Sequence, residues 1–195
     1  MVGRRDFVER ARLIVEVGGP DIAFHLRAPH ASGRRLHDLA RAVTGAAADA
    51  GAVLLVNDRI DVALAAADGA QVGARGVRVR HARRMLGAGR LLGASVHTAA
   101  EAIEAAAEGA DFVLAGTIWP TPSHPGRTGA GRELIREIAS SGIAVIAIGG
   151  VTPERGAEAR EAGASGIAVI RGVWDAADPA GAVRHYLKYW KGNDV

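Results

Sequence analysis

The residues whose types and spacing most clearly indicate a chemical role follow two apolar runs near the C-terminal end of the sequence. Gly149 and Gly150 close the first run, and Thr152 then supplies an N-cap candidate with proline at the first helical position. The second run ends at Ile170 and Arg171, again beside a helix start. Backbone N–H groups at helix starts point at an anion, and the helix dipole favours it. The two turns therefore predict a phosphate site, with an ordinary tight turn as the alternative.

Three histidines, His25, His97 and His124, lie near the carboxyl ends of predicted strands. In a barrel of parallel strands the chemistry takes place at that end. Histidine gives and takes protons near neutral pH, and it also supports loops by hydrogen bonding. We therefore treat these three as catalytic candidates. The other histidines are expected at the surface.

Short apolar segments alternate along the chain with helical segments rich in alanine, arginine and glutamate. The apolar segments predict strands at roughly 22–28, 53–57, 69–73, 91–96, 112–118, 144–148 and 166–170. The segments between them predict helices at roughly 6–17, 34–50, 59–66, 78–86, 99–108, 131–140, 153–162 and 180–190. This alternation indicates an α/β fold with a parallel sheet whose strands are covered on both faces.

The spacing of these elements is regular and no low-complexity linker interrupts it, so residues 1–195 are expected to form one domain. The Pro/Gly-rich stretch 120–131 lies between a predicted strand and a predicted helix. Its position favours a functional loop, with a floppy surface loop as the alternative.

The composition excludes several classes of protein. The 195 residues include no cysteine, so a disulfide framework and a thiolate metal site are excluded. The densest group of arginines, at 78–90, is interpreted as a solvated helix face, since no aromatic platform for nucleic acid accompanies it. No apolar run approaches a membrane span, and the N-terminal residues lack the apolar h-region of a signal peptide. We expect a soluble, cytoplasmic protein that binds neither nucleic acid nor membrane.

Several motifs stand in an order that resembles the thiamine phosphate synthase/TenI superfamily, from about Phe24 to Tyr186. The motifs are Val56–Ala63, Gly93–Thr98, Gly109–Val113, Gly116–Ser123, Ala147–Val151 and Gly163–Ile170. The resemblance implies a TIM (β/α)8-type barrel, a thiazole-phosphate ligand and a dimer. It implies either of two activities. Thiamine phosphate synthase joins hydroxymethylpyrimidine diphosphate to thiazole phosphate with Mg²⁺, and TenI is a cofactor-free thiazole tautomerase.

Residues expected for the synthase are changed at several positions. Arg27 matches a family arginine, but Pro29 stands where the family has a lysine for the diphosphate. Gly76 stands at the second Mg²⁺ aspartate, and His124 at a loop lysine. Asp58 alone remains as a weak metal candidate. The resemblance therefore predicts low or absent synthase activity even with excess Mg²⁺, and a role for Mg²⁺ only if that activity is retained.

The tautomerase interpretation needs no cofactor and fits the loops at 126–131 and 150–155. Thr117 stands at TenI's proposed catalytic histidine, so His25, His97 or His124 would have to replace it. His25 and His124 stand where the synthase family has glutamine and lysine, so ligand binding is favoured over catalysis for both. For His97, catalysis and support of its loop by hydrogen bonds are equally favoured. The resemblance also places Arg27, Asn57, Thr121, Ser123, Gly149, Gly150, Ile170 and Arg171 at the ligand.

We therefore expect a TenI-like thiazole tautomerase that binds a thiazole phosphate. A thiamine phosphate synthase with a remodelled diphosphate site is the first alternative. A non-catalytic phosphate-ligand binding or regulatory protein is the second, because the phosphate turns are intact while the residues for chemistry are changed.

The eight predicted helices are matched by only seven predicted strands, so the first strand of the barrel is expected to be missing. Strand number, tilt and shear are linked, and seven strands cannot close as eight do. The strands at 22–28 and 166–170 would flank a gap with unpaired backbone groups. We expect the N-terminal segment or a neighbouring subunit to cover that gap, the second case giving a homodimer.

Overall fold

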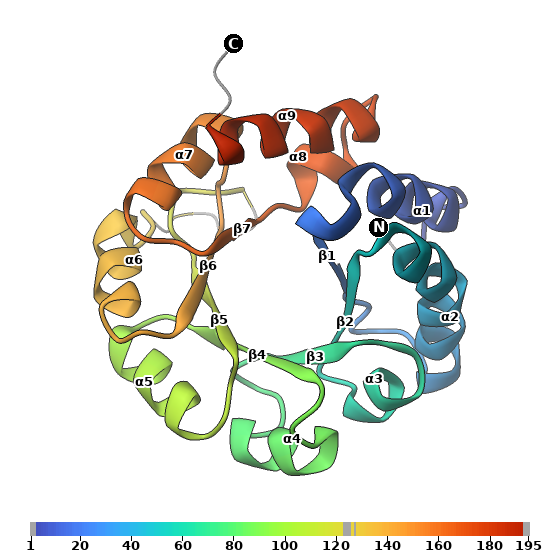
Figure 1. Cartoon of the computed structure of the whole chain (residues 1–195), viewed down its shortest axis with the longest axis horizontal. Helices are drawn as coiled ribbons and strands as arrows, with labels where there is room; N and C mark the ends of the chain where they lie inside the picture. The colour runs from blue at the N-terminus through green and yellow to red at the C-terminus, as the bar shows by residue number, and fades with distance from the viewer. Residues whose placement is uncertain (1–2, 123–125, 127, 193–195) are drawn as a thin grey trace.

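The computed structural model of the chain describes residues 3–122, 126 and 128–192. Within them, seven parallel strands lie side by side in chain order: β1 Ala23–Leu26, β2 Val53–Asn57, β3 Gly69–Val72, β4 Leu91–Val96, β5 Phe112–Gly116, β6 Ala144–Ile148 and β7 Gly166–Ala168. Helices surround the sheet in a TIM-type barrel architecture (Figure 1). The α/β prediction is confirmed, and the seven-stranded sheet is consistent with a missing first strand.

The helices begin and end close to the predicted positions. They are α1 Phe7–Gly18, α2 Gly33–Ala50, α3 Ile60–Ala66, α4 Val79–Leu86, α5 Ala99–Ala107, α6 Gly131–Ala139, α7 Pro153–Glu161, α8 Arg171–Trp174 and α9 Pro179–Lys191, with a 3₁₀ turn at Gly19–Asp21. Side-chain caps fix several starts, because a polar side chain accepts an N–H group that the helix itself leaves unpaired. Ser32, Thr98, Thr152 and Asp178 cap α2, α5, α7 and α9 in this way.

Four strands are shorter than predicted, and the short helix at 171–174 was predicted only as a helix start. β3 ends at Val72, one residue before its predicted end. β1 ends at Leu26 and β5 at Gly116, and β7 ends at Ala168 rather than at 170. The last difference arises because Ile170 leaves the extended conformation, with φ −112° and ψ −78°, to become the N-cap of α8. Apolar residues continue through this change, so hydrophobicity alone extended the predicted strand too far.

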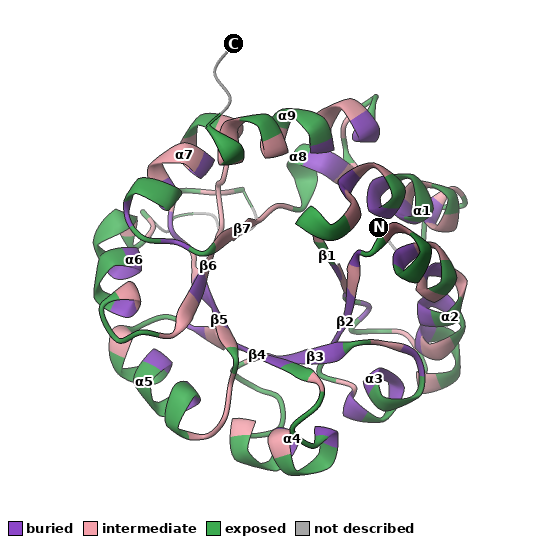
Figure 2. Cartoon of the chain, viewed as in Figure 1, coloured by how far each residue is buried: buried purple, intermediate pink, exposed green. Residues whose placement is uncertain are grey.

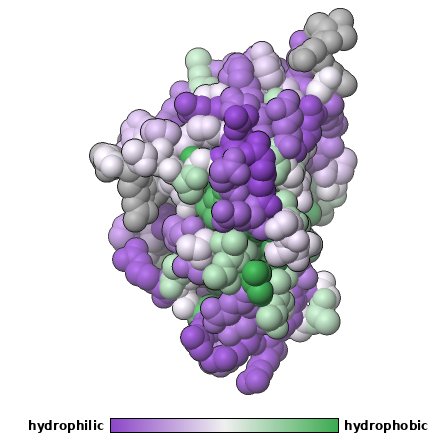
Figure 3. Space-filling view, turned by 90° about the vertical axis from the view of Figure 1, so that its left-hand side faces the viewer, coloured by the Kyte–Doolittle hydropathy of each residue, from purple (hydrophilic) through white to green (hydrophobic). Residues whose placement is uncertain are grey.

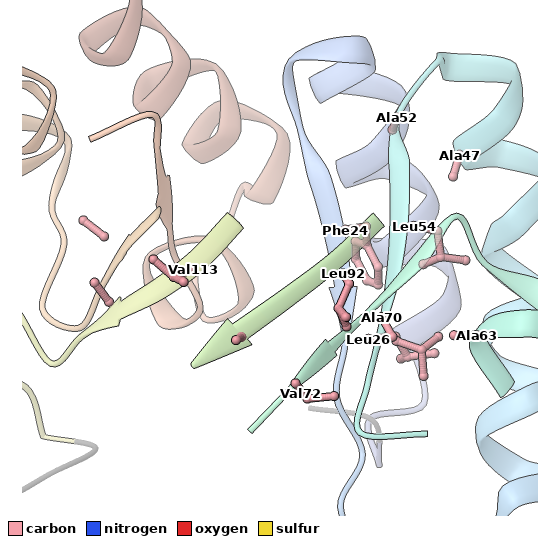
Figure 4. Close-up of a cluster of buried hydrophobic side chains, with 14 of the residues drawn as sticks. Phe24, Leu26, Ala47, Ala52, Leu54, Ala63, Ala70, Val72, Leu92 and Val113 are labelled. Carbon is pink, nitrogen blue, oxygen red and sulfur yellow. The ribbon is translucent and has the colours of Figure 1, made fainter. Parts of the chain in front are cut away.

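The two sides of the sheet differ in burial. Residues facing the helices, among them Leu54, Leu92 and Val113, are almost fully inaccessible. Figure 2 shows the strands and the inner sides of the helices as mostly buried, and Figure 4 shows part of this layer, with Leu26, Leu54 and Ala63 among its side chains. This outer layer forms the core, because each helix covers the strand face that points away from the barrel axis.

Solvent meets the outer sides of the helices. The face over α5, α6 and α7 is mostly hydrophilic, with small separate hydrophobic areas (Figure 3). Among them, Ile103 of α5 is more than half exposed. Scattered apolar side chains of this kind are normal on a soluble surface.

The sheet is open between β1 and β7, which are its edge strands. No hydrogen bond joins these strands within the described part of the chain. Trp174, at the end of α8, stacks on Phe7 of α1 and packs edge-on against Phe24 of β1. Arg10 of α1 also donates to the Ala176 carbonyl at 3.0 Å. The N-terminal helix therefore links β1 to α8 across the gap, as Figure 1 shows, and the strands have not contracted into a direct pair.

Candidate functional site at the carboxyl edge of the sheet

The turn after β6 has a backbone shape that requires glycine. Gly149 and Gly150 have φ angles of +97° and +65°, a region that other residues adopt only with strain. A Cβ at Gly150 would lie 2.6 Å from the Pro120 carbonyl oxygen and 2.8 Å from Cβ of Trp119. The Trp119 N–H donates to the Gly149 carbonyl at 3.0 Å. The β5–α6 segment therefore packs directly on this turn and leaves no room for a side chain.

Arg155 braces the same turn from α7. The hydroxyl of Thr152 accepts the Arg155 N–H, and the Arg155 guanidinium donates to the Gly150 carbonyl at 2.7 Å. Its Cζ also lies 5.7 Å from the centroid of the Trp119 ring. These contacts hold the carbonyl side of the turn, while the Gly150 N–H donates to no other described residue. Resemblance pointed to Arg155 only as part of a loop motif, and no sequence signal indicated its contact with Trp119.

The turn after β7 carries the second predicted part of the site. Ile170 is 44% exposed, and Arg171 begins α8 with its N–H unbonded within the described residues. The Arg171 guanidinium donates to the Thr121 hydroxyl at 3.0 Å, across 50 positions of sequence. Arg171 forms no ion pair in the described part of the chain, so its charge is not neutralised there by a carboxylate. The structure thus places Arg171 beside Thr121, and their joint role at a ligand stays a prediction.

The histidine candidates have different surroundings. Burial, and then the nearby Arg27 charge, lower the pKa of His25 to about 4, although Asp58 and Asn57 act in the opposite direction. Nε2 of His25 is inaccessible and has no hydrogen-bond partner among the described residues. His25 is therefore neutral at physiological pH and offers a ring nitrogen for hydrogen bonding.

His97 is half exposed at the start of α5. Its backbone N–H donates to the Glu101 carboxylate at 2.6 Å, and its ring lies 3.6 Å from the same carboxylate. This arrangement supports the loop interpretation of His97 more than the catalytic one. The predicted His124 and Ser123 lie outside the described residues.

Asp58 tests whether this edge fits a metal ion. It has φ +58°, and one carboxylate oxygen accepts the Gly73 N–H at 2.7 Å while the other accepts the Asn57 amide at 2.6 Å. A Cβ at Gly76 would lie 2.5 Å from Oδ1 of Asp58. The loop after β3 therefore closes onto the carboxylate, and no cluster of three or more acidic or histidine ligands occurs among the described residues. These residues do not form a two-carboxylate Mg²⁺ site.

Two arginines near these strand ends differ in whether they pair with a carboxylate. Arg59 is held by Asp61 through two hydrogen bonds. Arg27 is exposed at the end of β1 and makes no hydrogen bond or ion pair with another described residue. Arg27 is therefore a cation at this end of the sheet that is available to an anionic ligand.

Several known proteins similar to this chain are named for the formation of thiamine phosphate. The sequence model of the family described as "Thiamine monophosphate synthase" matches residues 2–173. A thiamine-phosphate synthase from Methanoculleus marisnigri is 42% identical over 94% of this chain and 88% of its own length. One from Salinispora arenicola is 42% identical over 93% and 85%. The solved thiamine phosphate pyrophosphorylase from Pyrococcus furiosus superposes with a TM-score of 0.87 at 32% identity, covering 98% of this chain and 91% of that one.

The described residues contain no helix that combines the length and the apolar character required to cross a membrane.

Proposed function

The chain belongs to the thiamine monophosphate synthase family, and we propose that it is a thiamine phosphate synthase. In the proposed reaction the ring nitrogen of a thiazole phosphate bonds to the methylene carbon of hydroxymethylpyrimidine diphosphate. The C–O bond to the diphosphate breaks, and diphosphate leaves with the electron pair. The observation that carries the proposal is the pair of phosphate turns, Gly149–Gly150 and Ile170–Arg171, in a chain similar to synthases over most of its length.

The thiazole phosphate is proposed to bind at these turns. The N–H groups of Gly150 and Arg171 have no partner among the described residues and lie beside the starts of α7 and α8, where a helix favours an anion. Arg171 adds a charge-assisted hydrogen bond, and Thr121 and Ile170 complete this side of the site. Holding the phosphate fixes the position of the thiazole ring before the new bond forms.

The pyrimidine diphosphate is proposed to bind near the ends of β1 and β2. His25 and Asn57 offer neutral hydrogen-bonding groups for a pyrimidine ring, and Arg27 offers a positive charge for the leaving diphosphate. Pro29 cannot supply the cation that the family lysine provides. We therefore expect turnover slower than that of a chain with the complete set of cations.

Mg²⁺ is not given a step in this proposal. Asp58 is engaged by Gly73 and Asn57, and Gly76 leaves no second carboxylate. A single carboxylate with waters and substrate phosphates would hold Mg²⁺ only weakly. We expect a weak response of the rate to Mg²⁺.

The comparisons favour the synthase over the TenI-like tautomerase that was the main expectation, because the similar proteins are named as synthases. Binding without catalysis is the second candidate function, and the observation in its favour is the Asp58 carboxylate enclosed by the Gly73 loop. The homodimer and the cytoplasmic location stay predictions. Light scattering of the purified protein tests the first.

The deciding experiment incubates purified protein with thiazole phosphate and hydroxymethylpyrimidine diphosphate, with and without Mg²⁺, and measures thiamine phosphate and diphosphate. The synthase proposal expects both products in equal amounts. Interconversion of thiazole tautomers without thiamine phosphate would establish the tautomerase instead. Calorimetric binding of thiazole phosphate with no turnover of either kind would establish the non-catalytic protein.

A further inference from the structure

Tyr186 of α9 contacts the residue that follows the first phosphate turn. Its hydroxyl donates to the Val151 carbonyl at 3.1 Å, across 35 positions of sequence. Val151 comes directly after Gly149 and Gly150, so a hydrogen bond to its carbonyl fixes the exit of that turn. The phenol is partly buried, and burial, followed by the charge of Glu154, raises its pKa. It is therefore a permanent donor at neutral pH.

The same phenol lies over the residue that follows the second phosphate turn. A Cβ placed on Gly172 would lie 2.2 Å from the Tyr186 hydroxyl oxygen and 3.0 Å from Cζ of its ring. Gly172 follows Arg171 directly in α8. Only a residue without a side chain allows the phenol to approach α8 this closely. One side chain thus contacts the backbone just beyond both turns.

Other side chains of the described residues that contact one of these turns do not connect it to the other turn. Arg155 reaches the first turn only, and Arg171 reaches the β5–α6 loop through Thr121. Helix α9 packs on both α7 and α8, which begin at the two turns, and Figure 1 shows it spanning them. Tyr186 is an α9 side chain that reaches both places.

We infer that Tyr186 is a positioning residue that sets the spacing between the two phosphate turns. A phosphate gripped by both turns needs their N–H groups at a fixed separation, because hydrogen bonds weaken steeply with distance and angle. Tyr186 lies in the C-terminal helix α9, beyond residues 2–173 that the family model matches. The inference rests on the proposed binding of thiazole phosphate at these turns.

The test compares Tyr186→Phe with Tyr189→Phe in the full-length chain. Tyr189 lies on the same helix, stacks edge-on with His185, and its hydroxyl has no hydrogen bond within the described residues. We expect Tyr186→Phe to raise the KM and the calorimetric Kd for thiazole phosphate about fivefold, as loss of one hydrogen bond would. The kcat and the melting temperature should change little, and Tyr189→Phe should match wild type.

A second pair of variants tests the contact with Gly172. Gly172→Ala forces the new methyl against the phenol oxygen and should raise the Kd for thiazole phosphate more than Tyr186→Phe does. Combining Gly172→Ala with Tyr186→Phe removes that oxygen, so the double variant should bind better than Gly172→Ala alone. Additive losses would show that the phenol does not couple the turns.

The outcomes separate this inference from the proposed function. If wild type binds thiazole phosphate and Tyr186→Phe binds it equally well, the positioning role is wrong and the proposed function stands. If Tyr186→Phe lowers kcat and melting temperature together without changing the Kd, Tyr186 is structural only. If wild type itself binds no thiazole phosphate, the proposed function fails and the positioning role fails with it.

Discussion

The carboxyl edge of this sheet contains two regions that we propose bind anions by different means. After β6 and β7, the binding groups are backbone N–H groups held by glycine conformations and supported by Arg155, Arg171 and Tyr186. After β1 and β2, binding depends on side chains, and there the Asp58 carboxylate is engaged by the protein itself.

This difference explains why the turns after β6 and β7 keep their groups for phosphate, whereas the region after β1 and β2 loses groups for diphosphate and metal. A backbone donor survives any substitution that keeps the chain conformation, because the N–H group does not depend on the side chain. A cation or a metal ligand is lost with its side chain, as at Pro29 and Gly76. We therefore expect phosphate affinity to be robust here and diphosphate chemistry to be weakened.

The largest effect is expected from Gly150→Val, which breaks the β6 turn. Valine at φ +65° is strained, and its Cβ would collide with the Pro120 carbonyl and Trp119. Losing two charge-assisted hydrogen bonds to phosphate would cost roughly 3 kcal/mol, about a hundredfold in Kd. Calorimetry with thiazole phosphate measures this loss.

Gly142→Val is the matched control for that substitution. Gly142 also has a positive φ, +85°, but a Cβ there meets nothing within 4 Å, and it lies in the turn between α6 and β6, at the opposite end of the sheet. It should lose stability while keeping its affinity. Equal affinity of Gly150→Val and wild type, with the fold intact by circular dichroism, would contradict the site assignment.

His25 predicts a pH dependence that belongs to the β1–β2 region. Its folded pKa of about 4 lies below the ordinary value of 6.5, so between these values the unfolded chain binds a proton that the folded chain does not. Stability should therefore fall as the pH falls below 6.5. The loss between pH 7 and pH 5 should be roughly 1–2 kcal/mol in the free energy of unfolding, allowing for partial exposure.

Denaturant unfolding of wild type and His25→Gln across this range isolates the contribution. Glutamine cannot titrate, so its variant should lose less stability on acidification than wild type. Parallel curves for the two proteins would show that His25 is not held neutral in the fold.

The sequence was sufficient for the elements that depend on local patterns. Apolar runs predicted all seven strands, and Thr152 marked the start of α7 as its predicted N-cap. Local patterns do not contain the contacts that bring distant segments together. The Arg171–Thr121 bond spans 50 positions, and the Tyr186–Val151 bond spans 35. The hydrogen bond between the Gly73 N–H and the Asp58 carboxylate could not be predicted for the same reason, because only the folded β3–α4 loop brings the two groups together.

Arg171 differs from the rest of the site after β6 and β7, because it offers the phosphate a charged side chain where the other proposed groups are backbone N–H groups. Arg171→Ser should raise the KM for thiazole phosphate about fivefold to tenfold, the value of one hydrogen bond to a charged group with some exposure. Arg171→Lys should recover part of the affinity as a point charge. Unchanged kinetics in Arg171→Ser would show that Arg171 serves only the contact with Thr121.

The smallest effect is expected from Gly76→Asp, which places a second carboxylate beside Asp58 in the loop after β3. The new Cβ would lie 2.5 Å from Oδ1 of Asp58, so the loop must shift, and two like charges then share one site. A cost of about 1 kcal/mol would lower the melting temperature by about 2–4 °C. Millimolar Mg²⁺ should reverse the charge part of this loss, because paired carboxylates are ligands that it accepts. Gly76→Asn has the same size without the charge, so it should show the steric loss with no response to Mg²⁺. Identical melting of the Gly76→Asp protein with and without Mg²⁺ would mean that the loop holds Asp58 away from any metal, and that the changed residue at 76 is not what prevents a two-carboxylate site.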